Sequence, residues 1–429
     1  MPCQHKKKLL ATLLVSTVAA LSAMSAHAQT ACATPNTSNY GLSVSVAGGS
    51  CSAVSTDTVE QFLDKLSNTG LRSVDLSYNG TQPATIGANF NSLGMTISYP
   101  NTGFTGTGAA LTLSIPGLGV SQQFLGADRD ASKELMADYL KKTNIIGRIM
   151  KYQAANSPTS PITGAGGLMP SMVAGDFNQN FTDMATNIAG PASQASAASQ
   201  NNVTPNLIGV ALSYSSLTAL GRDTTAISMP FSYTIRNNLD PRRQLVLSLP
   251  ITQVDTAGAK SYQTGLGAAY RLPMNDSWTL TPSGRVSVVG SKDLATVAGL
   301  YSLSLTSTYI WALPDFDVAM GNMISYNQTM KFKSGDYSFD PDIQSTVLRN
   351  GVMLSQPVSV GGKKMSVEYS FIDTRYTGSD FYVDNTQEIG ITLGTNKRAY
   401  SSRSFFRAGL SYIHGKDMDG FTLNAGYWF

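Results

Sequence analysis

Residues 227–236 read Ile-Ser-Met-Pro-Phe-Ser-Tyr-Thr-Ile-Arg, with an apolar side chain at every second position from Ile227 to Ile235. Successive side chains of a β-strand point to opposite faces of a sheet, so this stretch predicts a strand with one apolar face. The other face carries small neutral side chains and ends with Arg236. A strand of this kind is suited to separate an apolar environment from a wet one.

The same alternation recurs from residue 207 to the C-terminus. Its spacing of about 19 residues per strand exceeds the roughly 8 to 12 residues of soluble sandwiches and fits a membrane strand of about 10 residues plus a loop. We predict twelve strands, at 208–214, 227–235, 245–251, 262–272, 278–288, 299–311, 316–326, 348–354, 365–371, 389–393, 406–412 and 421–429.

The composition favours a membrane-embedded sheet over a soluble domain or a helix bundle. Only 13% of the 429 residues are charged, against roughly 25% in soluble chains. The mean hydropathy of −0.05 is too low for a bundle of transmembrane helices. In lipid every backbone amide needs a partner, so the sheet must close on itself. We therefore expect an all-β membrane protein with an antiparallel transmembrane β-barrel of about 12 strands.

The last strand ends in an aromatic residue. Leu423, Ala425, Tyr427 and Phe429 alternate up to the final position. This pattern is similar to the C-terminal signal by which Gram-negative outer-membrane barrels are recognised for insertion. The resemblance implies a barrel-assembly machinery as partner and places Phe429 at the periplasmic rim. Turns such as 237–243 then face the periplasm, and the longer loops, 327–345 among them, face the outside.

The N-terminal segment has the features of a cleavable signal peptide. Lys6, Lys7 and Lys8 precede an apolar stretch, and Ala26-His27-Ala28 carries small residues at the positions that a signal peptidase reads. We predict a signal peptide at 1–28 and export to the Gram-negative outer membrane. Its removal takes three positive charges away, so the formal net charge falls from +3 to zero. A neutral chain gives no indication of nucleic-acid binding.

Residues 29–124 are predicted to form a small β-rich N-terminal domain. After removal of the signal peptide, Cys32 and Cys51 are the remaining cysteines. Two cysteines in an exported chain usually pair, so we expect a disulfide between them, with two free thiols as the alternative.

Residues 125–152 show apolar residues at helical spacing, which predicts an amphipathic helix; among them are Leu135, Tyr139, Ile146 and Ile149. Two placements are open for this helix: a plug or pore-threading helix in the lumen, or packing on the small N-terminal domain. Residues 153–206 are low in charge and rich in Ala, Ser and Gly, which predicts a flexible linker. Residues 207–429 form the predicted barrel.

Few residues are candidates for chemistry. His414 is the one histidine that remains after signal removal, and the sequence has no Gly-x-Ser-x-Gly motif. We therefore expect no enzymatic activity, no metal site and no cofactor. Four charged residues are expected on the inner face of the barrel: Arg236, Arg285, Glu368 and Arg407. The three arginines would bias an open pore toward anions.

The order of signal peptide, small domain, helix, linker and barrel resembles that of autotransporter-type proteins. More narrowly, residues 124–132, 349–351 and 378–383 and the closing strand resemble the solitary outer-membrane autotransporter-like barrel domain. The resemblance implies an outer-membrane translocator that displays or exports its N-terminal region or another cargo, in contact with outer-membrane lipid and lipopolysaccharide. Two alternatives stay open: a passive porin-like channel plugged by the 128–152 helix, and a surface adhesion module. The sequence does not identify a cargo or solute.

Overall fold

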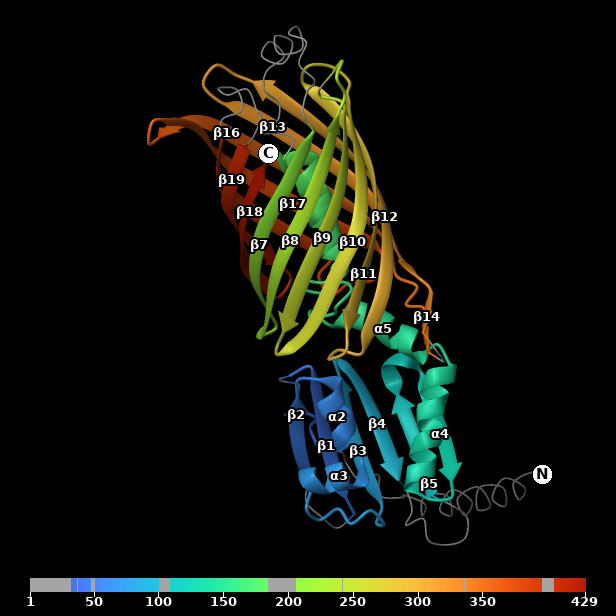
Figure 1. Ribbon diagram of the computed structural model, residues 1–429. Helices are drawn as coiled ribbons and strands as arrows, with labels where there is room; N and C mark the ends of the chain where they lie inside the picture. The colour runs from blue at the N-terminus through green and yellow to red at the C-terminus, as the bar shows by residue number, and fades with distance from the viewer. Residues whose placement is uncertain are drawn as a thin grey trace, which may run out of the picture.

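A computed structural model describes residues 32–36, 38–47, 51–99, 109–183, 206–240, 242–334, 337–395 and 405–429. The described chain forms two parts joined end to end, a small sheet with helices and a long barrel (Figure 1). The predicted signal peptide at 1–28 lies outside the described residues.

The C-terminal part is a closed antiparallel barrel of twelve strands, as the alternation predicts. Around the barrel the order is β10-β11-β12-β13-β16-β17-β18-β19-β20-β7-β8-β9. The strands are β7 (Leu207–Ala219), β8 (Arg222–Arg236), β9 (Gln244–Thr256), β10 (Ala259–Pro273), β11 (Trp278–Ser291), β12 (Thr296–Ala312), β13 (Asp317–Met330), β16 (Gln344–Val360), β17 (Lys363–Gly378), β18 (Asn385–Thr395), β19 (Phe405–Gly415) and β20 (Met418–Trp428). The short pair β14 (Phe332–Ser334) and β15 (Tyr337–Phe339) lies in the loop between β13 and β16.

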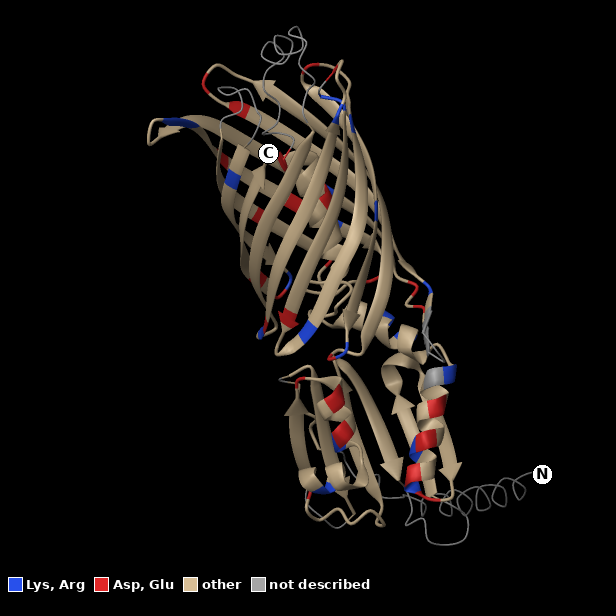
Figure 2. Ribbon diagram, viewed as in Figure 1, with Lys and Arg blue, Asp and Glu red and all other residues tan. Residues whose placement is uncertain are grey.

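The outer wall of the barrel is apolar. On β9, Leu247, Leu249 and Ile251 point outward and are 39 to 51% exposed, whereas Val246 and Ser248 point inward and are buried. Charged residues are sparse on the wall and gather at the two rims and inside (Figure 2). An apolar exterior on a closed sheet is the arrangement that a bilayer requires.

The N-terminal part is built on a six-stranded antiparallel sheet of order β2-β1-β3-β4-β5-β6. Its strands are β1 (Tyr40–Val46), β2 (Cys51–Thr56), β3 (Ala84–Phe90), β4 (Leu93–Tyr99), β5 (Ala109–Ile115) and β6 (Val120–Gly126), with a 3-10 turn, η1 (Pro116–Leu118). The predicted disulfide is present and joins Cys32 to Cys51, whose Cα atoms are 5.9 Å apart.

Four helices accompany this sheet: α2 (Val59–Lys65), α3 (Asn68–Val74), α4 (Arg129–Lys142) and α5 (Ile145–Asn156). The side chain of Asp128 caps α4 by accepting a hydrogen bond from the Ala131 amide, and the helix ends at Thr143, whose backbone is extended. The helix predicted over 125–152 is therefore two helices. None of the described helices is both long and apolar enough to cross a membrane.

A further helix follows inside the barrel, where the sequence predicted a flexible linker. Turns over residues 157–167 lead into α6 (Leu168–Phe177), which continues as a π-helix, η2 (Asn178–Thr182). The linker prediction for 153–206 is therefore wrong over residues 153–156, which end α5, and over residues 168–183. Residues 184–205, the remainder of that segment, lie outside the described residues.

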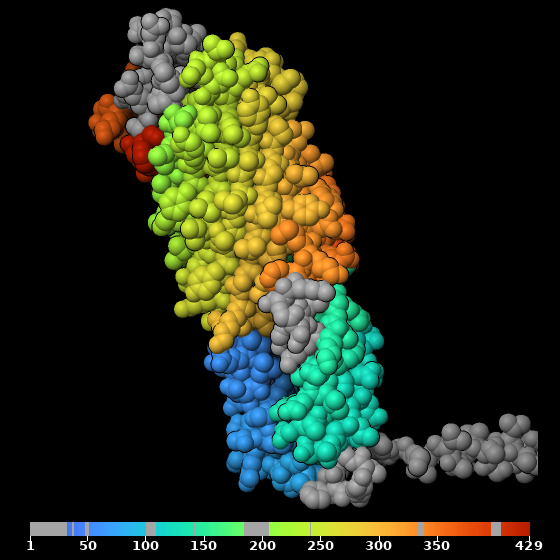
Figure 3. All heavy atoms as spheres, turned by 45° about the vertical axis from the view of Figure 1, so that its right-hand side comes forward, coloured from blue at the N-terminus to red at the C-terminus, as the bar shows by residue number. Residues whose placement is uncertain are grey.

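The small sheet sits against the barrel end formed by the β7–β8, β9–β10 and β11–β12 connections (Figure 3). The Asn39 amide donates to the Thr256 carbonyl at 3.0 Å, and the Tyr40 hydroxyl donates to the Asp293 carbonyl at 3.1 Å. Leu294 and Ala259 of the barrel rim belong to the same buried apolar cluster as the core of the sheet. The two parts therefore share a continuous core.

Charged side chains at the edge of the interface also join the N-terminal part to the barrel. Lys292 forms an exposed ion pair with Glu60 of α2 at 2.8 Å, and its ammonium lowers the pKa of that carboxyl. Arg222 donates to the side-chain oxygen of Asn36 at 2.6 Å and is itself buried. Lys151 of α5 pairs with Asp342 of the long loop at 3.1 Å.

Candidate functional site: the occupied lumen

One wall of the lumen is apolar and receives α6. The helix presents Leu168, Met169, Met172, Val173, Phe177 and, from η2, Phe181 to inward-facing side chains of the barrel, among them Val289, Leu300, Ile310, Ala319, Met323, Val347 and Met353. All of these residues are buried. The inside of the barrel is thus a packed core along this wall and not the uniformly wet lumen that the small polar side chains suggested.

Two glycines of the wall make room for the two phenylalanines. A Cβ atom at Gly321 would lie 2.5 Å from the ring of Phe181, and one at Gly351 would lie 3.0 Å from the ring of Phe177. Both glycines are paired with each other across β13 and β16. The absence of side chains at this one level of the sheet therefore allows the aromatic rings to reach the wall.

A buried ion pair fixes the middle of the lumen helix. The carboxylate of Asp176 lies 2.6 Å from the guanidinium of Arg285 on β11 and also accepts a hydrogen bond from Ser302 on β12 at 3.2 Å. One turn further, the side-chain amide of Asn180 donates to Ser283 at 3.0 Å. Polar residues of the wall thus form an ion pair or hydrogen bonds with the polar side chains of the segment.

Two more arginines hold the end of the segment through its backbone. Arg271 donates to the Gln179 carbonyl at 2.6 Å. Arg407 donates to the Thr182 carbonyl at 3.1 Å, lies 3.4 Å from the Asp183 carboxylate and pairs with Glu368. Carbonyl groups at a helix C-terminus carry partial negative charge, so cations stabilise this end.

The predicted lumen candidates are placed as follows. Arg285, Glu368 and Arg407 face inward and are buried, and each forms an ion pair with another buried or half-buried group. Arg236 is the half-buried last residue of β8, at the barrel end near Phe429. Two of the three arginines behind the expected bias toward anions, Arg285 and Arg407, are therefore paired with carboxylates.

The four residues predicted for a plug helix do not lie on the lumen helix. Leu135 is 45% exposed, and the Tyr139 ring packs on Phe124 of the small sheet with the ring centroids 5.6 Å apart. Ile149 packs against the core of that sheet, while Ile146, on α5, contacts the lumen cluster. The alternative placement, packing on the small domain, is the one that α4 adopts. Its many charged residues would be costly to bury in a barrel, whereas α6 carries a single paired carboxylate.

The residues that the sequence reasoning missed are those of α6 and η2. Their signal is present, because Leu168, Met172 and Val173 recur near helical spacing and Phe177 and Phe181 continue it. Because Gly, Ala and Ser surround these residues, the composition of the segment indicated a linker.

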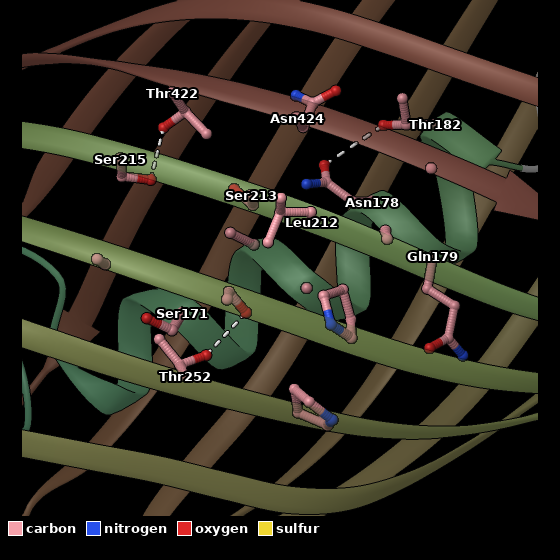
Figure 4. Close-up of a pocket in the computed structure, with 18 of the residues that line it drawn as sticks. Ser171, Asn178, Gln179, Thr182, Leu212, Ser213, Ser215, Thr252, Thr422 and Asn424 are labelled. Atoms are coloured by element: carbon pink, nitrogen blue, oxygen red, sulfur yellow. Dashed lines mark hydrogen bonds between the residues drawn. The ribbon is translucent and has the colours of Figure 1, made fainter.

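The opposite side of the lumen is not filled by the described residues. A cavity of about 390 Å³ lies between the α6–η2 segment and strands β7, β8, β9 and β18 to β20. Figure 4 shows Ser171, Asn178 and Gln179 on the helical segment and Ser213 and Thr252 on the facing strands. Ser215 and Thr422, which close the β20–β7 seam on the cavity side, hydrogen-bond each other at 2.9 Å.

The remaining candidates are at the rims. Leu423, Tyr427 and Phe429 of the terminal pattern are 47 to 51% exposed on the outer wall, Ala425 is exposed beside them, and the Phe429 backbone pairs with Ile208. His414 is exposed on β19 and lies 2.6 Å from the Asp419 carboxylate, which also accepts a hydrogen bond from Tyr412. Over the described ranges, no three His, Cys, Asp or Glu side chains cluster as metal ligands do.

No family model and no curated protein matches this sequence. Several solved barrels resemble it. The β domain of the Bordetella autotransporter BrkA is 13% identical, with a TM-score of 0.43, and the match covers 53% of this chain and 99% of that one. The translocator domain of NalP from Neisseria meningitidis is 14% identical, with a TM-score of 0.42 and coverages of 61% and 97%. The KdgM porin is 10% identical, with a TM-score of 0.31 and coverages of 51% and 98%. Barrels of the translocator kind and of the porin kind are thus both among the structures similar to this chain.

Proposed function

We propose that this chain is an integral outer-membrane barrel of autotransporter type that displays its own N-terminal domain at the cell surface. The observation that carries the proposal is the relative position of two landmarks. The small sheet contacts the rim that contains Thr256 and Asp293, and Phe429 lies at the opposite rim, where it pairs with Ile208. If the terminal strand ends in the periplasm, as its assembly-signal pattern implies, the N-terminal domain lies outside the cell.

The path of the chain supports the same reading. From the N-terminal domain the backbone enters the lumen at residues 157–167 and descends through α6 and η2, and β7 then begins beside Phe429. The chain therefore crosses the barrel once through its interior before the first wall strand starts. This route connects a domain on one side of the membrane to the other side, where the first strand of the barrel begins and the last strand ends.

The test uses two epitope tags at opposite ends of the molecule. One is inserted between Gly80 and Thr81, in a polar turn of the small domain, and the matched control is inserted after Leu239, which is 94% exposed in the turn between β8 and β9. On intact cells we expect antibody and protease to reach the first tag, and to reach the second only after the outer membrane is opened. The reverse pattern would show that the N-terminal domain is periplasmic and would end the proposal.

A plugged channel is the second candidate, and the cavity beside α6 is the observation that favours it. In planar bilayers, a channel predicts measurable ion conductance from the intact protein and a larger conductance after deletion of residues 168–183. A display barrel whose lumen is sealed predicts conductance only after that deletion. The two tags and the conductance measurement are independent, so either function can fail alone.

A further inference from the structure

One edge of the N-terminal sheet carries a row of backbone groups that another strand can use. β6 (Val120–Gly126) is the outermost strand, and among the described strands it pairs only with β5. Sheet proteins usually protect such an edge with charged residues or proline. β6 reads Val-Ser-Gln-Gln-Phe-Leu-Gly and contains neither. This edge is therefore a ready template for pairing with a further strand.

Exposed apolar side chains lie on both faces of the sheet at this edge. Leu125 of β6 is 61% exposed, on the face away from α4, and Leu135 of α4 is 45% exposed. Each residue advances about 100° around a helix. Tyr139 packs toward β6 and Arg129 points back over β4, so Leu135 lies about 40° beyond Tyr139, on the side of the edge. No large apolar side chain is exposed on the six described residues of β2, the other edge strand.

The same side of α4 is complementary to itself in charge. Asp128 and Lys142 are each seven positions from Leu135 in the sequence, and both are exposed. Seven residues are almost two full turns, so both lie within about 20° of Leu135 around the helix. When two copies meet with their α4 helices antiparallel about Leu135, Asp128 of each copy comes opposite Lys142 of the other. Opposite charges then flank a central apolar contact at both ends.

The spacing of the elements fits such a pair. α4 packs over β5 and β6, and neighbouring strands lie about 4.8 Å apart. When two β6 strands pair edge to edge, a helix centred between β5 and β6 has its axis about 4.8 Å from the two-fold axis. The two α4 axes are then about 10 Å apart, which is the distance at which helices pack. Pairing of the edges therefore brings Leu135 of both copies together without any rearrangement.

The direction of the strands fixes the orientation of the two copies. The strands of the small sheet run along the long axis of the molecule, with Tyr40, at one end of the sheet, bonded to the barrel rim (Figure 1). Antiparallel pairing of two β6 strands turns one copy end for end relative to the other. The two barrels then point in opposite directions, so the copies lie in two facing membranes and not side by side in one.

We propose that the β6–α4 edge is a docking surface for the N-terminal domain of a second copy of this chain, held in a facing membrane. The two six-stranded sheets join there into one continuous antiparallel sheet. That this contact joins two cells rests on the surface display proposed above. The contact itself does not, and it is tested with purified protein.

The experiment uses the full chain in proteoliposomes whose N-terminal domains are accessible to added protease. We expect these vesicles to cluster, measured by dynamic light scattering as a rise in apparent diameter over vesicles without protein. In detergent we expect dimers, measured by analytical ultracentrifugation at the highest concentration that stays soluble. Dimers in detergent without clustering of vesicles would overturn the antiparallel arrangement.

A pair of variants tests the contact at the two-fold axis. Leu135→Lys and Leu135→Glu each place like charges face to face, so each should raise the dimer dissociation constant at least tenfold and leave its vesicles dispersed. Mixing vesicles of the two variants sets a lysine opposite a glutamate and should restore clustering. Leu63→Lys, at a residue of α2 that is 56% exposed, is the matched control and should change nothing.

A third variant tests the strand pairing apart from the helices. Leu125→Lys adds a charge to the edge strand itself and should also weaken the dimer at least tenfold. The proposal is overturned if vesicles of the unaltered protein stay dispersed, if either Leu135 variant clusters alone, or if mixing the two does not restore clustering. None of these results bears on the display of the N-terminal domain, which the two epitope tags measure.

Discussion

Asp176 on the lumen helix and Arg285 on β11 form a buried ion pair with 2.6 Å between carboxylate and guanidinium, each side chain being at most 6% exposed. Removing one partner of such a pair leaves an uncompensated charge, at a cost of about 3 to 5 kcal/mol. We expect Asp176→Ala to unseat α6 and to raise both the ion conductance of the barrel and hydrogen exchange over residues 168–182. The matched control is Asp138→Ala, which removes an exposed pair with Lys142 and should change neither quantity. Equal effects of the two substitutions would contradict the anchoring role of Asp176.

The contact between Gly321 and Phe181 predicts a steric effect. A methyl group at position 321 would meet the Phe181 ring at 2.5 Å, so Gly321→Ala should push the ring off the wall, with a cost of about 1 to 3 kcal/mol for overpacking. Hydrogen exchange over η2 should rise while the barrel stays resistant to heat in detergent. Gly290→Ala is the control, because no heavy atom lies within 4 Å of a Cβ atom at that position. Protection of η2 that is unchanged in Gly321→Ala would argue against this packing.

Removal of the disulfide should destabilise the N-terminal domain alone. Cys32 and Cys51 are separated by 19 residues, and cross-links of this span stabilise a domain by about 2 to 4 kcal/mol through the unfolded chain. The double variant Cys32→Ala with Cys51→Ala should make the N-terminal domain sensitive to protease at lower denaturant concentration. Heat resistance of the barrel should not change. A parallel loss in both parts would mean that they unfold as one unit.

Alkaline pH should weaken the N-terminal domain. Burial raises the pKa of Tyr99 to about 12 from its ordinary value of 10.0, and its ring lies 4.5 Å from the guanidinium of Arg129. The folded state therefore holds a proton that the unfolded state releases, so this stabilisation is present below pH 10 and is lost as the pH rises toward 12. Tyr99→Phe keeps the ring over Arg129 and should flatten that part of the pH dependence, measured as the denaturation midpoint between pH 9 and 12. Tyr40 and Tyr78, whose pKa values are also raised by burial, account for the part that remains.

The barrel could be predicted because its signal is local. Each strand, such as β8 or β9, has one face toward lipid and one toward the interior, so its own sequence alternates. Counting these alternating runs gives the twelve strands. The lumen helix could not be found in this way, because its partners come from distant strands. Leu300, Met323 and Val347 face inward on strands that are apolar outward as well, so no alternation marks them. The pairing of Asp176 with Arg285 spans 109 residues and leaves no trace in the local pattern of either residue.

Arg407, on the last strand but one, donates a hydrogen bond to the Thr182 carbonyl, 225 residues earlier in the chain. Closing so long a loop carries a large entropic cost before any contact repays it. Arg271 on β10 can bind the Gln179 carbonyl early, whereas the contact of Arg407 with Thr182 forms only after nearly the whole wall has been paired. We expect α6 to be held first by β10 and β11, through Arg271 and Arg285, and the last residues of the segment to be fixed only when β19 completes the barrel.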